Sequence, residues 1–69
     1  MIRHTNNGRV YEITATPIQS ADNPELVTLV TITENGKPFD KYRTDKTAPE
    51  YYAHLRKLLD FDGYEEFAD

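Results

Sequence analysis

The segment Glu34-Asn35-Gly36-Lys37 constrains the fold of this 69-residue chain more than any other feature. A type I′ β-turn needs a positive φ angle at both central residues, and Asn followed by Gly adopts that conformation at low cost. Residues 26–33, rich in β-branched side chains, precede the turn, and residues 38–43 follow it. We therefore expect a tight hairpin. Its two-residue loop would set Glu34 opposite Lys37, Ile32 opposite Phe39, Val30 opposite Lys41 and Leu29 opposite Tyr42.

A second strand is expected over residues 9–16, where Tyr11, Ile13 and Ala15 share one face. Asn7-Gly8 repeats the hairpin signal and leaves a short N-terminal strand as an open alternative. That strand would set Ile2 opposite Ile13, Arg3 opposite Glu12 and His4 opposite Tyr11. Residues 19–25 have the composition of a loop.

A helix is expected to start at Thr47, because Thr47 and Glu50 have the spacing of a capping box. It would run to about Asp60, with its apolar stripe formed by Tyr51, Leu55, Leu58 and Leu59. The fold class is α+β: an antiparallel β-meander of three strands, or four with the N-terminal one, and one C-terminal helix packed on one face. Residues 1–60 form a single α+β domain in this prediction, and residues 61–69 form an acidic aromatic C-terminal tail.

Charge is distributed unevenly along the chain. The net charge is −4, yet residues 60–69 hold five acidic and no basic residues, which leaves the first 59 residues with eight Lys and Arg against seven Asp and Glu. The absence of cysteine excludes disulfides and thiolate metal sites. Without a stretch of about 20 apolar residues or a signal-peptide pattern, we expect a soluble, cytoplasmic protein with no membrane partner, either monomeric or homodimeric.

The side chains needed for most catalytic chemistry are missing or scattered. Ser20 is the only serine and has no histidine near it in sequence, so a nucleophilic site is not expected. His4 and His54 lack a recognised metal-ligand pattern, and the Glu50–His54 spacing is typical of a solvent-facing helical pair. The three glycines form no phosphate-binding pattern. We therefore expect no enzyme, no catalytic residue, no metal and no cofactor.

The most unusual segment is the C-terminal end, where aromatic and acidic residues alternate. One interpretation folds its aromatic rings back on the sheet to enlarge a thin core. The other gives the main functional hypothesis: a small non-enzymatic protein-binding module, a regulator or inhibitor of a larger protein or complex, whose tail docks in a basic groove. The candidate contact residues are Tyr51, Tyr52, Phe61, Asp62, Tyr64, Glu65, Glu66 and Phe67.

The alternative function depends on which face of the second hairpin the helix covers. The face with Val30, Ile32 and Phe39 carries more apolar residues, and we expect it to be the buried one. If the opposite face, with Leu29 and Tyr42, were buried instead, a row of cations and one aromatic would be exposed for nucleic acid: Lys37, Phe39, Lys41 and Arg43. A β-bulge would shift either assignment by one residue.

The second arrangement resembles the three-stranded DNA-binding domains of plant AP2 factors and phage integrase arms. The resemblance covers residues 9–60 and depends on element order, the Asn35-Gly36-Lys37 hairpin tip and the Arg43-Thr44-Asp45-Lys46 segment before the helix. It implies DNA binding by the sheet, although such domains are usually basic and this chain is not. Cysteine-free acidic chains of this size also occur among phage and bacterial accessory proteins.

Overall fold

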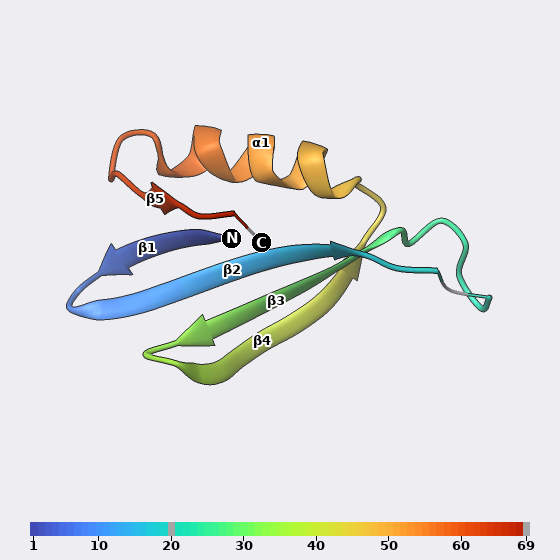
Figure 1. Cartoon of the computed structure of the whole chain (residues 1–69), viewed down its shortest axis with the longest axis horizontal. Coiled ribbons are helices and arrows are strands. Elements are labelled where there is room, and N and C mark those ends of the chain that lie inside the picture. Colours follow the sequence, from blue (N-terminus) through green and yellow to red (C-terminus); the bar gives the residue numbers. More distant parts are fainter. Residues whose placement is uncertain (20, 69) are drawn as a thin grey trace.

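The chain folds into one antiparallel sheet and one helix (Figure 1). The computed structural model describes residues 1–19 and 21–68, so Ser20 and the acidic Asp69 lie outside the described residues. The elements in chain order are β1 (Ile2–Asn6), β2 (Arg9–Pro17), β3 (Thr28–Glu34), β4 (Lys37–Thr44), α1 (Ala48–Leu59) and β5 (Glu65–Glu66). The sheet order is β4-β3-β2-β1-β5, so the predicted meander is confirmed and the sheet has five strands instead of three or four.

The N-terminal strand, which the sequence left open, is present. β1 pairs with β2 in the predicted register: Ile2 lies opposite Ile13, Arg3 opposite Glu12 and His4 opposite Tyr11. Asn7 has a φ of 53° and Gly8 a φ of 75°, as a two-residue turn with positive φ at both positions requires. The same geometry recurs at Asn35, whose side-chain Oδ1 also accepts the N–H of Val10 at 2.9 Å and so ties the β3–β4 turn to β2.

The β3–β4 register differs from the prediction after the first two residue pairs. Glu34 lies opposite Lys37 as expected, but a β-bulge places Ile32 opposite Asp40, so Phe39 is an additional residue without its own partner on β3. Val30 consequently faces Tyr42, not Lys41, and Leu29 faces Arg43, not Tyr42. Because side chains alternate between faces, this shift of one residue turns over every β4 side chain from Asp40 onward.

Helix α1 packs on the face that carries Val30, so the expected burial is confirmed for Val30, whereas Phe39, assigned to the same buried face, is 58% exposed. The buried apolar residues are Ile2, Ile13, Ala15, Val30, Tyr51 and Leu55. The predicted N-cap is formed: the Thr47 hydroxyl accepts the Glu50 N–H at 3.3 Å, and the Glu50 carboxylate accepts the Thr47 hydroxyl at 2.8 Å. Leu58, predicted to be part of the apolar stripe, is 60% exposed. Within the described residues no helix is long and apolar enough to cross a membrane.

Candidate protein-binding surface

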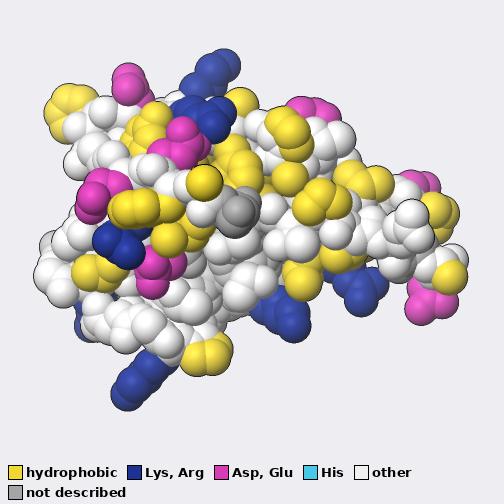
Figure 2. Space-filling model, viewed as in Figure 1, with side chains coloured by type: hydrophobic (Ala, Val, Ile, Leu, Met, Phe, Trp, Pro, Cys, Tyr) yellow, Lys and Arg dark blue, Asp and Glu magenta, His cyan; other side chains and the backbone are white. Residues whose placement is uncertain are grey.

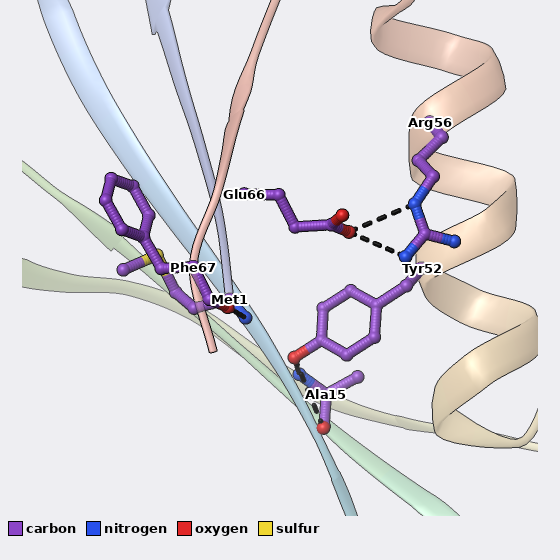
Figure 3. A network of polar contacts seen from close by, with 6 residues as sticks. All are labelled: Met1, Ala15, Tyr52, Arg56, Glu66 and Phe67. Carbon is purple, nitrogen blue, oxygen red and sulfur yellow. Dashed lines mark hydrogen bonds and ion pairs between the residues drawn. The ribbon is translucent and has the colours of Figure 1, made fainter. Parts of the chain in front are cut away.

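The predicted tail contributes the fifth strand to the sheet. Glu66 lies opposite Ile2, and Glu65 lies opposite Arg3. The Phe67 N–H donates to the Met1 carbonyl at 2.8 Å. Figure 3 shows Arg56 reaching from α1 to the Glu66 carboxylate, which it contacts at 2.6 and 3.0 Å. This part of the tail therefore connects the helix to the edge of β1.

The aromatic residues of the tail differ in how far they fold back. The Arg3 guanidinium lies 4.6 Å from the centre of the Phe67 ring, and Phe67 and Tyr64 keep 39% and 37% exposure. Phe61 is 98% exposed and covers nothing. The turn before Tyr64 is held by a contact of 3.2 Å between His4 Nδ1 and the Gly63 carbonyl. The fold-back interpretation thus describes Phe67 and Tyr64 but not Phe61, while Asp62 and Glu65 remain exposed.

Tyr51 and Tyr52, two further candidate contact residues, are engaged within the chain itself. Tyr51 is 7% exposed, and its hydroxyl hydrogen-bonds to the Tyr42 hydroxyl. Burial, together with the neighbouring Tyr42, raises the pKa of Tyr51 above its ordinary value. The Tyr52 hydroxyl accepts the Ala15 N–H at 2.9 Å and donates to the Ala15 carbonyl at 3.4 Å (Figure 3). Both side chains fix the helix to the sheet, because each satisfies its polar group internally while burying its ring.

Helix α1 leaves part of its own side of the sheet uncovered, chiefly at β4. In Figure 1 the helix lies along the β5–β1–β2 side, whereas β3 and β4 extend away from it. Among the described elements α1 makes its main strand contacts with β2. Five apolar residues surround the uncovered region, and we call them the open aromatic surface: Tyr11, Ile32, Phe39, Tyr42 and Leu58.

Contacts between these residues place them on the helix side of the sheet. The rings of Tyr11 and Phe39 meet edge to face with centres 5.5 Å apart, and Tyr42 meets Tyr51 of the helix in the same way at 6.3 Å. Leu58 follows Tyr51 by two helical turns and so lies on the same side of α1. Phe39 keeps 58% and Tyr42 keeps 39% of its surface exposed. The surface therefore offers large apolar groups that the chain itself does not bury.

The bulge divides the predicted row of cations between the two faces of the sheet. Phe39 packs against Tyr11 on the helix side. Lys37 lies opposite Glu34 in the strand register, and the Glu34 carboxylate accepts the Tyr11 hydroxyl at 2.9 Å on that same side. Lys41 and Arg43, opposite Thr31 and Leu29, lie on the other face. Lys and Arg side chains project along the lower border in Figure 2, where Figure 1 places β4, and acidic side chains are scattered over the rest of this view.

No group of three or more potential metal ligands occurs within residues 1–19 and 21–68. Glu50 and His54 are both exposed on α1. A hollow of about 580 Å³ lies between the loop after β2 and strand β4 and is lined by Leu29, Lys41 and Arg43 among others. It is open to solvent.

Sequence reasoning missed the roles of Tyr42 and Leu58, because it placed Tyr42 on the sheet face away from the helix and Leu58 in the buried stripe of the helix. Pro38, immediately after the tight turn, was a usable signal, since proline in a strand is confined to edges and bulges. The chain matches no protein-family model, and neither the curated proteins nor the solved structures that were searched contain a match.

Proposed function

We propose that the chain is a small protein-binding module that contacts its partner through the open aromatic surface. The observation that carries this proposal is the exposure of Phe39 and Tyr42, at 58% and 39%, on the helix side of the sheet, together with that of Leu58 on the helix, at 60%. Large exposed side chains clustered on one face are unfavourable in water and mark interaction sites more often than isolated ones do. Aromatic residues also dominate the energetics of protein interfaces.

Contacts within the chain support the same function. Phe39 packs against Tyr11, and Tyr42 hydrogen-bonds to Tyr51, so both rings have fewer rotamers to lose when a partner binds. Binding then costs less side-chain entropy than it would with mobile residues. The tail takes a supporting role in this proposal, because Glu66 and Phe67 stabilise the sheet instead of projecting toward a partner.

The nucleic-acid alternative has weaker support. It required Lys37, Phe39, Lys41 and Arg43 on one exposed face, where cations could follow phosphates while the ring stacks on a base. The β-bulge separates Lys41 and Arg43 from Phe39, and the chain remains acidic overall. We therefore retain protein binding as the proposed function.

Site-specific photocrosslinking tests this proposal. A photoreactive amino acid placed at position 39 or 58 should crosslink to one defined partner in native lysate, whereas the same group at the exposed Thr16, on the opposite face, should not. With the purified partner, Phe39→Ser should weaken binding by about 2 kcal/mol, or about 30-fold. Phe61→Ser is the matched control, since Phe61 is exposed but lies outside the surface. Equal crosslinking at positions 16, 39 and 58 would refute the proposal.

A further inference from the structure

We propose that the partner contributes an extended segment that adds to β4 as a sixth strand, and that this segment alternates acidic and apolar side chains. This inference rests on the proposed function and specifies the partner for the same site. It starts from the sheet order, in which β4 is a terminal strand of eight residues with no other strand on its outer side among the described residues. Such an edge carries backbone groups that a further strand can bind.

The backbone hydrogen bonds define which residues of β4 face outward. The Thr44 carbonyl accepts the Val27 N–H at 3.0 Å and therefore points toward β3. The backbone N–H and C=O groups of successive residues point to opposite sides of a strand. The backbone groups of Tyr42 therefore also point toward β3, and those of Lys41 and Arg43 point away from it. The Lys41 N–H confirms this direction, because it donates to the Asp40 Oδ1 at 2.8 Å and not to β3.

The side chains of the same residues specify the chemistry of an added strand. Tyr42 lies on the helix side, within the open aromatic surface, and Lys41 and Arg43 lie on the other face. Cross-strand neighbours share a face, so alternate residues of an added strand would cover Tyr42 or contact the two cations. Apolar residues suit the positions that cover Tyr42, and carboxylates suit the positions that contact Lys41 and Arg43. The partner's charge would thereby complement the basic border visible in Figure 2.

A second copy of this chain does not fit this edge well. Two β4 strands related by a twofold axis pair antiparallel, with residues of the same face opposite one another. Lys41 and Arg43 share a face, so such pairing brings like charges together in each register that overlaps these residues. The complementary occupant is therefore a different, acidic segment.

Asp40 gives the edge a built-in competitor for strand addition. Its carboxylate occupies the Lys41 N–H, which an added strand would need, while Pro38 and the bulge leave the first half of β4 irregular. Natural edge strands commonly carry such features, which prevent indiscriminate pairing. Strand addition is thus confined to residues 41–44 and must displace Asp40.

Peptide titration of the full chain, labelled with ¹⁵N, tests the inference. The probe is a capped eight-residue peptide of alternating Val and Glu. Its controls are the Val and Lys counterpart, a peptide with the four Val and four Glu grouped in blocks, and two versions N-methylated on alternate residues. We expect changes in the amide chemical shifts of residues 41–44, and binding at least about tenfold weaker for the Lys peptide. Only one of the two N-methylated peptides should lose binding, because only alternate N–H groups face β4.

Variants of Asp40 separate hydrogen bonding from charge. Asp40→Ala frees the Lys41 N–H, whereas Asp40→Asn removes the same charge but retains an acceptor, so the alanine variant should bind the probe about fivefold more tightly than the asparagine variant. Equal affinities of the two variants, equal binding of the Val/Glu and Val/Lys peptides, or shifts located away from β4 would overturn the inference. Crosslinking at positions 39 and 58 that persists despite such results would leave the proposed function standing, so the two failures are distinguishable.

Discussion

Deletion of residues 64–69 tests whether the C-terminal segment is a free tail or a strand of the sheet. The structure places several interactions in this segment that the rest of the chain cannot replace, and three of them set the scale of the loss. The hydrogen bond from Phe67 to Met1 contributes about 1 kcal/mol, the cation–π contact with Arg3 about 0.5–1 kcal/mol, and the exposed Arg56–Glu66 pair about 0.5 kcal/mol after solvent screening. The deletion should therefore reduce the free energy of unfolding by about 2–3 kcal/mol.

This loss is large for a chain of 69 residues, whose total stability is expected to be about 3–10 kcal/mol. Urea unfolding followed by far-ultraviolet circular dichroism measures it. With a slope of about 1 kcal/mol per molar urea, the midpoint should fall by about 2–3 M. Phe61→Ser is the control and should remain within about 0.5 kcal/mol of the wild type, because Phe61 is 98% exposed. A deletion variant within that same margin would refute the role assigned to β5.

Three further substitutions have defined expected outcomes. Thr28→Val should leave the free energy of unfolding unchanged or raise it by up to about 1 kcal/mol in urea titration, because Thr28 is fully buried and its hydroxyl has no hydrogen-bond partner among the described residues; a loss above about 1 kcal/mol would contradict this. Thr47→Ala should cost about 1 kcal/mol by removing the helix cap, and an unchanged midpoint would argue against that cap. Tyr51 has a pKa raised by burial, so the folded state keeps the phenolic proton at a pH where the unfolded chain loses it, and stability should fall as pH rises above the ordinary value of 10.0, by up to about 1.4 kcal/mol per pH unit. Tyr51→Phe cannot ionise and should show a shallower alkaline decline in thermal melts, whereas parallel profiles of the two proteins would exclude this origin.

The proposed binding mode joins features that were predicted for different reasons. The sequence suggested aromatic anchors in the tail and cations on the second hairpin as alternative sites. In the structure, Tyr42 from the hairpin joins the exposed aromatic residues on the helix side, while Lys41 and Arg43 lie on the reverse face of the same strand. One edge strand therefore presents apolar and cationic groups in alternation, which is why a single extended partner could use both.

The sequence by itself determined the local structure of this protein. The turns at Asn7-Gly8 and Asn35-Gly36, the helix cap formed by Thr47 and Glu50, and the order of strands and helix all depend on interactions between residues close along the chain. Backbone sterics and hydrogen bonds over a few residues suffice to select these conformations. For this reason the α+β class could be predicted, and so could the register of β1 on β2, although the sequence left the presence of β1 open.

Only the tertiary structure decided which residues remain exposed. The bulge at Phe39 adds one residue to β4 and exchanges the faces of all that follow, so Tyr42 meets the helix and Lys41 and Arg43 turn away from it. The pairing of β5 with β1 joins segments more than 60 residues apart, and the position of α1 over β2 leaves Phe39 and Leu58 uncovered. These outcomes depend on packing between distant elements, where a shift of one residue reverses a face at little local cost, so periodicity along the chain could not select among them.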